Sequence, residues 1–353
     1  METVLTIIQG KGTLPREQAG RNIHYDDASL ANYKKVEQGD FIIHLRSFEG
    51  GLEMANEDGI VSPAYTILRC KKPHSSLFYE AYFHTDEFIN HILSKSVEGI
   101  RDGRQISYEA FKWLGLPYCN VSEQEKIAQL FCTFSHRIEK QQQMVDALKK
   151  YKRGLFNQIF SAISKSSQCR KLRELVRVSG GKTPSMSNSL YWNGDIVWIS
   201  SKDMKSSRIS GSELKITNLA LNEMTLYHPG TLLLVARSGI LKHSLPLAIL
   251  EVDATINQDI KALQVHGCNA FYLYYAILSQ EDTIIRTLVK TGTTVQSLMM
   301  DSFLNIEIPT PDIDQQQRII DKLAKLEKYV EVQEKELSLL SQMRNGLLQQ
   351  LFI

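Results

Sequence analysis

The sequence predicts a protein of mixed α+β or α/β fold class that is built twice over, as a pseudo-twofold internal duplication. Two globular lobes with curved β-sheets, at residues 1–118 and 164–310, are each followed by a long helix, at residues 119–163 and 311–353. Three observations predict this plan. Two segments align with each other without a gap, both carry an apolar repeat typical of paired helices, and short β-rich runs precede each of them.

The aligned segments are residues 117–160 and 309–352, which match at a constant offset of 192. Apolar residues recur inside both in steps of four and three. This 3.5-residue period, sustained over several heptads, is typical of a left-handed coiled coil, and we expect the two helices to pair with each other in antiparallel fashion. The predicted seam consists of Ile127, Phe131, Phe134, Ile138, Val145, Leu148, Leu155, Ile159, Ile319, Leu323, Leu326, Val330, Leu337, Leu340, Leu347 and Leu351.

Polar residues interrupt this seam at matching positions of the two copies, at Gln141 and Lys152 in the first and at Gln333 and Arg344 in the second. Matching interruptions indicate that both helices meet the same packing demand. The alternative is that each helix packs only on its own lobe.

Both segments also open with a helix-start signal. Ser122 with Glu125, and Asp314 with Gln317, have the spacing of a capping box. In such a box a short oxygen side chain accepts from the free N–H groups of the first turn.

The duplication continues upstream in weaker form. Gly39 and the apolar run after it correspond to Gly230 and its run, and Arg46 falls on Arg237 at the same offset of 191. The aromatic run LFYEAYF at 77–83 lies opposite AFYLYYA, and we expect these aromatic residues to form core or a face for a partner. The first lobe is abbreviated, because it has no counterpart of Leu172–Ser185.

The composition is that of an ordinary globular protein, with 43% hydrophobic and 23% charged residues, and it contains no apolar run long enough to span a membrane. The N-terminus lacks the basic region of a secretory signal, so we expect a cytoplasmic protein. The net charge is only +2, but residues 164–210 contain nine Lys and Arg against three Asp and Glu. A basic stretch of this kind can follow a phosphate backbone.

No catalytic set or metal site is predicted. Gly180-Gly181-Lys182-Thr183 resembles the end of a phosphate-binding loop, but Val176 stands where such a loop needs glycine. The run from Ser62 to Tyr65 resembles the base-gripping motif of amino-methyltransferases, yet no glycine-rich cofactor loop precedes it. The histidines show no metal-ligand spacing.

The chain resembles, over nearly its whole length, the specificity subunits of type I restriction-modification systems. The match is carried by the following segments: DGRQISYEAF (102–111), LPYCNVSEQEKIA (116–128), VSGGKTPS (178–185), YWNGDIVWISSKDM (191–204), ARSG (236–239), INQDI (256–260) and IEIPTPDIDQQQRI (306–319). In that family two target-recognition domains alternate with two long conserved helices.

The resemblance implies a non-catalytic subunit that binds double-stranded DNA and reads a bipartite target, one half-site per lobe. It implies two modification (methyltransferase) subunits and restriction (endonuclease and translocase) subunits as partners, which would carry S-adenosylmethionine, ATP and Mg, while this chain holds no cofactor. The modification subunits would dock on the helices, and Phe156, Leu348 and Phe352 are the expected contacts.

The helix stretch from Ile127 to Ile159 is about 50 Å long and predicts a ruler that spaces the two half-sites. The same length of B-DNA is roughly 14 base pairs.

Six basic residues are candidates for contact with DNA phosphates or bases. They are Arg46, Arg237, Lys182, Lys202, Lys205 and Arg208. Two alternatives remain open, a repeated ion pair inside the lobes for Arg46 and Arg237 and a plain solvated surface for the lysines. The competing function is a coiled-coil scaffold that binds only protein.

Overall fold

The computed structural model describes residues 2–19, 27–43, 51–99, 105–290 and 295–352. They divide into two compact units, Met1–Met144 with Gln333–Ile353, and Val145–Val332. Each unit combines one lobe with one half of each long helix. No helix in these described ranges has the length and apolar character that crossing a bilayer requires.

The two long helices are α3 (Val121–Ser166) and α8 (Ile313–Leu351). Both begin earlier than the capping boxes predict. The cap of α3 is Asn120, whose Oδ1 accepts from the N–H of Glu123 at 2.9 Å, and the cap of α8 is Asp312, whose Oδ1 accepts from the N–H of Gln315 at 2.8 Å. The predicted caps Ser122 and Asp314 are therefore wrong by two residues. In both helices an Asn or Asp is followed three positions later by Glu or Gln, two residues before the predicted box. Each helix starts at this earlier capping signal.

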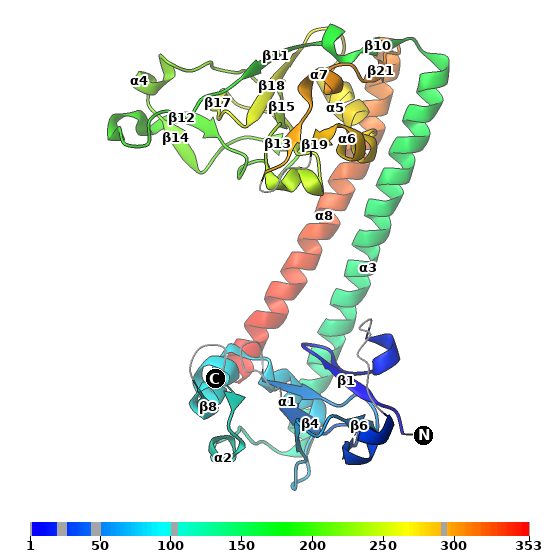
Figure 1. Cartoon of the computed structure of the whole chain (residues 1–353), viewed down its shortest axis with the longest axis vertical. Helices are drawn as coiled ribbons and strands as arrows, with labels where there is room; N and C mark the ends of the chain where they lie inside the picture. The colour runs from blue at the N-terminus through cyan, green and yellow to red at the C-terminus, as the bar shows by residue number, and fades with distance from the viewer. Residues whose placement is uncertain (1, 20–26, 44–50, 100–104, 291–294, 353) are drawn as a thin grey trace. The chain divides into compact units, whose positions relative to one another are not determined.

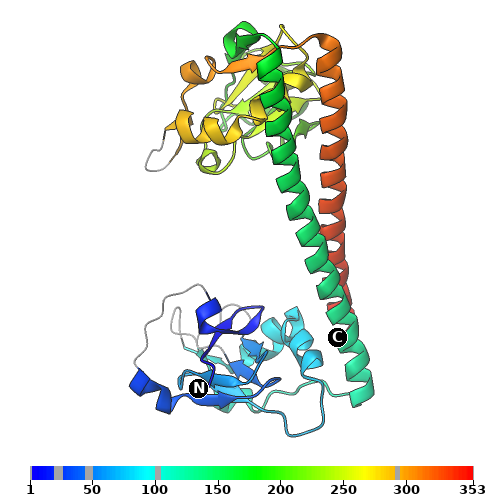
Figure 2. The same cartoon turned by 90° about the vertical axis from the view of Figure 1, so that its right-hand side faces the viewer.

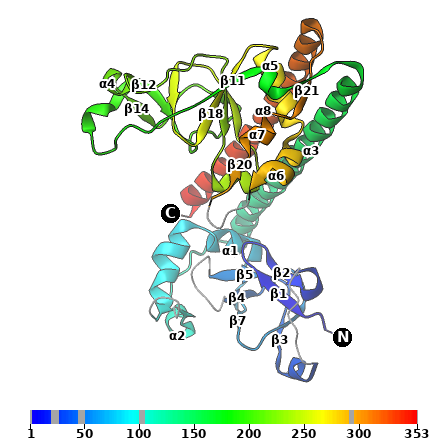
Figure 3. The ribbon, with the colours of Figure 1, turned by 45° about the horizontal axis from the view of Figure 1, so that its top comes forward.

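The first lobe contains a three-stranded antiparallel sheet of order β5-β4-β7, and α1 lies beside β5 (Figure 3). Phe41, Leu52, Phe83 and Phe88 are among the residues that form its core. Smaller strand pairs flank this sheet. The elements are β1 (Leu5–Ile8), β2 (Gly12–Pro15), β3 (Lys34–Val36), β4 (Phe41–Ile43), β5 (Leu52–Met54), β6 (Gly59–Val61), β7 (Thr66–Leu68), α1 (Ser76–Phe83), a π-helix (Glu87–Ile92), β8 (Val97–Glu98), β9 (Gln105–Ile106) and α2 (Tyr108–Phe111), with short 3-10 helices at Arg16–Gln18, Asp27–Asn32 and Leu93–Ser96.

The second lobe has a five-stranded sheet of order β11-β18-β15-β16-β13 and a smaller sheet of order β14-β12-β17. Helix α5 lies between the larger sheet and α8 (Figure 1), and Tyr272 and Leu273 of α5 are fully buried. The elements are β10 (Cys169–Lys171), β11 (Val176–Gly180), β12 (Trp192–Ile199), β13 (Arg208–Ile209), β14 (Leu214–Ile216), α4 (Asn218–Leu221), β15 (Leu232–Val235), β16 (Leu247–Leu250), β17 (Ala254–Ile256), β18 (Ile260–Val265), α5 (Ala270–Leu278), α6 (Glu281–Leu288), β19 (Val289–Lys290), β20 (Ser297–Leu298), α7 (Met300–Phe303) and β21 (Glu307–Pro309), with short 3-10 helices at Leu172–Glu174, Ser189–Tyr191 and Gly239–Lys242.

The two lobes share one topology. The order β5-β4-β7 in the first matches β16-β15-β18 in the second, and the pair β8-β9 matches β19-β20. Gly39 and Gly230 occupy the same turn before the central strand, with φ of 89° and 86°. A positive φ at this position favours glycine. The larger sheet of the second lobe has an added strand at each edge, β11 beside β18 and β13 beside β16, and no described residue forms such a strand beside β7 or β5.

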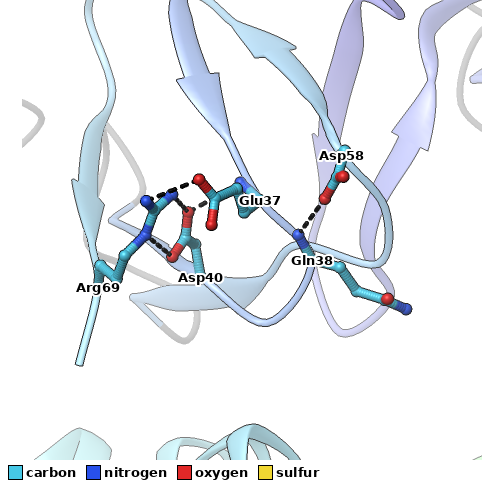
Figure 4. A network of polar contacts seen from close by, with 5 residues as sticks. All are labelled: Glu37, Gln38, Asp40, Asp58 and Arg69. Atoms are coloured by element: carbon cyan, nitrogen blue, oxygen red, sulfur yellow. Dashed lines mark hydrogen bonds and ion pairs between the residues drawn. The ribbon is translucent and has the colours of Figure 1, made fainter. Parts of the chain in front are cut away.

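The turn of the first lobe contains a carboxylate network, shown in Figure 4. Arg69 donates to both carboxylate oxygens of Asp40, at 2.8 and 2.6 Å, and to Glu37 at 2.8 Å. The N–H of Glu37 also donates to Asp40 at 2.8 Å, and the N–H of Gln38 donates to Asp58. Burial raises the pKa of Asp40, but the Arg69 and Glu37 hydrogen bonds outweigh it and hold that pKa below its ordinary value.

The long helices pair in antiparallel fashion inside each unit. In the first unit the Gln141 amide donates to Gln333 Oε1 at 2.9 Å, and Arg137 lies 3.6 Å from Glu336. In the second unit, where Figure 2 shows the two helices side by side, Lys152 lies 2.8 Å from Glu327. All predicted seam positions except Leu351 are buried or half-buried. Leu351 is 43% exposed, because the last turn of α8 instead buries Leu348 and brings Phe352 against Phe78, Tyr82 and Phe131.

A buried glutamine at the start of each long helix ties that helix to its lobe. Gln124 is fully buried, accepts from the N–H of Ser75 at 2.8 Å and donates to the carbonyl of Cys119. Its repeat-mate Gln316 accepts from the N–H of Asn269 at 2.9 Å and donates to the carbonyl of Pro311. Ser75 and Asn269 are the caps of α1 and α5, so one side chain fixes two helix starts at once.

We expect Gln316→Leu to destabilise the chain by about 1–3 kcal/mol, because the Asn269 N–H and the Pro311 carbonyl then lose their hydrogen-bond partner. Thermal and urea unfolding measure the change. Gln317→Leu is the matched control, since Gln317 is exposed and bonds only its helix neighbour Asp321. Equal unfolding midpoints for the two variants would contradict the assigned role of Gln316.

We expect Asp40→Asn to remove part of the acid sensitivity of the first lobe. The pKa of Asp40 is lower in the folded chain than in the unfolded chain, so its stabilising contribution is present above its unfolded pKa, about 4, and is lost as the pH falls through the folded value. The variant should be less stable than the parent at pH 7, and this difference should shrink towards pH 3. Unfolding curves at both pH values measure this, with exposed Asp58→Asn as the control. A difference that does not change with pH contradicts the prediction.

Candidate nucleic-acid interface

The loop between β17 and β18, residues Asn257–Asp259, is held rigidly by its neighbours. Asn257 is buried, its N–H donates to the Ile199 carbonyl at 2.9 Å, and its Oδ1 accepts from the N–H of Asp259. The carbonyl of Asp259 accepts from the N–H of Ala236 at 2.8 Å. Between these two anchored residues, Gln258 exposes its side chain. The backbone is fixed while the amide remains accessible.

Gln258 and Arg237 line one open cavity of about 430 Å³. Ser201, Ser238, Gly239, Asp259 and Val295 line it too. Arg237 follows β15, and its main chain is bridged to Ser297 on the other side. Its side chain is exposed, and no described carboxylate lies within ion-pair distance of it. The alternative of an ion pair inside the lobe therefore has no support at Arg237.

Two of the predicted lysines lie beside the same loop. The N–H of Lys182 donates to the carbonyl of Ile256 at 3.0 Å, directly before Asn257. Lys202 follows Ser201 of the cavity, in a turn that the Asp203 carboxylate holds by accepting from Ser200 at 2.7 and 2.8 Å. Both lysines are exposed. The structure thus gathers Lys182, Lys202 and Arg237 from three separate segments around Gln258.

The remaining candidates lie apart from this cluster or outside the described residues. Arg208 is 3.0 Å from Glu251 and stacks at 4.8 Å over the Phe271 ring, so its guanidinium is already engaged within the lobe. Lys205 is exposed, and its N–H donates to the carbonyl of Asp203. Arg46 lies outside the described residues.

The glycine motif Gly180-Gly181-Lys182-Thr183 has a packing explanation. A Cβ at Gly181 would lie 1.9 Å from the Ile256 carbonyl oxygen, so only glycine allows the chain to pass this close to β17. No helix follows Lys182 directly, which removes the element on which a phosphate-binding loop depends. Within the described ranges, no group of three or more His, Cys, Asp and Glu is arranged to hold a metal ion.

The aromatic clusters and the predicted docking residues lie in the interior. Tyr79, Tyr82 and Phe83 are 3–7% exposed, and Tyr272, Tyr274 and Tyr275 are 0–4% exposed, so both clusters are core. The prediction that Phe156 and Leu348 are exposed docking contacts is wrong, since they are 5% and 4% exposed. Phe352 is half-buried against aromatic rings of the first lobe. They are buried because the lobes cover these ends of the helices, a contact that the heptad pattern alone does not reveal.

A different helix surface is exposed and apolar. In the first unit Leu130, Met144, Leu339 and Met343 are 39–55% exposed. The ion pair between Arg137 and Glu336 places them on one side of the seam, because Arg137 is one heptad from both Leu130 and Met144, and Glu336 is one heptad from Met343. We call this set the flanking face.

The fold and the loop cluster define a class of duplicated binding protein, with two similar lobes joined to paired helices. The family model described as "Type I restriction modification DNA specificity domain" matches residues 164–342, which is half of the chain. The chain belongs to this family.

Curated relatives agree. The chain is 31% identical over 249 residues to the specificity subunit of the type I restriction enzyme EcoR124I/EcoR124II of Escherichia coli, covering 68% of this chain and 62% of the relative. It is 30% identical over 197 residues to the MjaIX specificity subunit of Methanocaldococcus jannaschii, covering 54% and 45%. The chain therefore spans about half to three fifths of the length of these relatives.

Solved structures show the same fold. The type I restriction-modification S subunit from M. genitalium matches with a TM-score of 0.59 at 17% identity, covering 91% of this chain and 84% of that chain. A chain from a study of complex assembly and conformational transition in a type I system matches with a TM-score of 0.58 at 16% identity, covering 90% and 83%.

Proposed function

We propose that this chain is a sequence-specific DNA-binding specificity subunit of a type I restriction-modification complex. The observation that carries the proposal is the gathering of Lys182, Lys202 and Arg237 around the fixed loop at Gln258, in a member of this family. Lysines serve as phosphate contacts that set position, and a guanidinium and an amide serve as base contacts. Such a set suits a DNA groove better than a protein surface.

The duplication supports a bipartite target. The matching sheet orders and the matching glycine turns give the first lobe the same framework for a recognition surface. The loops differ, because INQDI of the second lobe stands opposite VSPAY of the first. Two frameworks with different loops read two different half-sites, and the paired helices connect them.

The chain itself contributes binding and no catalysis. Methylation and cleavage belong to modification and restriction subunits, which bring S-adenosylmethionine, ATP and Mg, and the assembly works in the cytoplasm, where the genome is reached. The flanking face supports the partnership, because it is an apolar helix surface left uncovered by both lobes. We assign it to the modification subunit.

The DNA-binding proposal is tested by titrating fluorescent duplex DNA with the full chain at several salt concentrations. We expect the affinity to fall steeply with salt, and the double variant Lys182→Ala/Lys202→Ala to bind more weakly with a salt slope reduced by about 2. Lys322→Ala/Lys325→Ala on α8 is the matched control, since both lysines are exposed and far along the chain from the loop cluster. Affinity that does not respond to salt, with both double variants equal to the parent, supports the scaffold function instead.

The docking assignment is tested by co-purification of the chain with its modification subunit. We expect Leu339→Glu/Met343→Glu to weaken the complex about tenfold or more, because it places two charges in an apolar contact. Lys335→Glu, on the helix side opposite the seam, is the control and should retain the partner. Undiminished co-purification of the double variant contradicts this docking face, while DNA binding by the chain alone is unaffected either way.

A further inference from the structure

We propose that Gln258 and Arg237 are the base-reading pair of the second lobe, with Gln258 reading an adenine and Arg237 a guanine. This inference rests on the proposed function and goes beyond it, because it assigns sequence readout to two side chains and names the base that each one selects. It separates them from Lys182 and Lys202, which hold the DNA backbone.

The Gln258 amide is held by a neighbouring segment of the chain. Thr183 donates its hydroxyl proton to Gln258 Oε1 at 2.5 Å, which ties the amide to the residue after Lys182. The amide keeps two N–H donors, and its oxygen keeps one lone pair. A donor beside an acceptor in a fixed plane is complementary to N7 and N6 of adenine in the major groove.

The backbone that carries both side chains is preorganised. Asn257 and Asp259 are anchored on both sides of Gln258, and the main chain of Arg237 is anchored at its neighbours, since the Ala236 N–H donates to Asp259 and the Ser238 N–H donates to Gln296 at 3.1 Å. Side chains that project from a fixed backbone lose less entropy on binding than side chains of a loose loop. An exposed arginine whose backbone is fixed suits bidentate contact with O6 and N7 of guanine.

The cavity that both residues line is chemically mixed. Asp259 and the hydroxyl-bearing Ser201 and Ser238 lie in the same 430 Å³ space as Arg237. The Asp259 carboxylate in this cavity disfavours a phosphate group there. Base edges present donors and acceptors side by side, and a mixed set of acidic, basic and neutral groups matches them. The exposed lysines next to the cavity supply the phosphate contacts.

The experiment selects bound sequences from a library of duplex DNA with a randomised central region, using the full chain and sequencing the bound fraction. The parent should enrich a motif that contains one adenine and one guanine. Gln258→Leu should relax the preference for the adenine, and Arg237→Lys should relax the preference for the guanine. Each variant should lose about tenfold or more discrimination at one base pair and keep the rest of the motif. Thr183→Val should weaken the adenine preference without altering the guanine preference.

Two controls separate readout from folding and from charge. Gln168→Leu replaces another exposed glutamine of the same unit and should leave the motif unchanged. Lys202→Gln should lower binding to all sequences equally. The thermal unfolding midpoints of all variants should match the parent, since each altered side chain is exposed and forms no ion pair with the described residues.

The outcomes are distinct. A motif that stays identical in the Gln258 and Arg237 variants overturns this inference and leaves the proposed function intact. A parent that enriches no sequence at all, alone and with its modification subunit, overturns the proposed function. Relaxation of one position per variant, at the predicted base, establishes both.

Discussion

The structure depends on two helices that each serve two lobes. A helix whose apolar stripe repeats every 3.5 residues must bury that stripe along its whole length, and a single small lobe covers only a part of it. Each unit therefore combines half of α3 with half of α8. Within the first unit, Gln141 bonds to its own repeat-mate Gln333. A polar pair inside an apolar seam is satisfied only when the two amides meet, so it fixes the register of the helices at a cost in apolar burial.

The lobes are attached to these helices by the same device in both copies. Gln124 and Gln316 connect, through hydrogen bonds, the start of each long helix to the start of α1 or α5. The Tyr79 hydroxyl donates to the Pro117 carbonyl at 3.0 Å, and the Tyr272 hydroxyl donates to the Pro309 carbonyl at 2.7 Å. Buried polar groups with satisfied partners specify one arrangement of backbone, because every alternative leaves them unpaired. A recognition loop positioned by such a lobe is thereby fixed relative to the helix start next to it.

The sequence predicts the repeated parts well, and the reason is periodic burial. The heptad pattern gives the seam of α3 and α8, and the glycine turns at Gly39 and Gly230 identify the central strands. The helix starts were predicted two residues late, because Asn120 and Ser122 are equally good caps in sequence and only the lobe contact of Gln124 selects between them.

The candidate site is harder to predict. Lys182, Lys202 and Arg237 are visible as basic residues, but Gln258 has no charge or period to mark it. Its position depends on Thr183, which is 75 residues away in sequence. The engagement of Arg208 with Glu251 and Phe271 is also a long-range contact that composition cannot show.

The two copies also differ in the charges at the seam. In the second unit Lys152 meets Glu327, and Tyr275 donates to the other oxygen of the same carboxylate at 3.1 Å. The repeat-mates of Lys152 and Glu327 are Arg344 and Ser135, so the first unit has the cation without the carboxylate at that position. Glu80 of α1 supplies the negative charge instead. Burial and the nearby Glu53 raise the pKa of Glu80, and the charges of His84 and Arg344 lower it, with a net rise.

In the second unit the carboxylate is part of a long helix, whereas in the first unit it is part of α1 and therefore of the lobe. The first lobe therefore contributes a charge of its own beside its helix pair. The second lobe contributes none at this position, because Leu273 is the equivalent of Glu80. Exchanging the lobes would place Leu273 instead of Glu80 beside Arg344, and would add the Glu80 carboxylate to the pair of Lys152 and Glu327. The two halves therefore share one architecture but differ in how the lobe and the helix pair divide their charges.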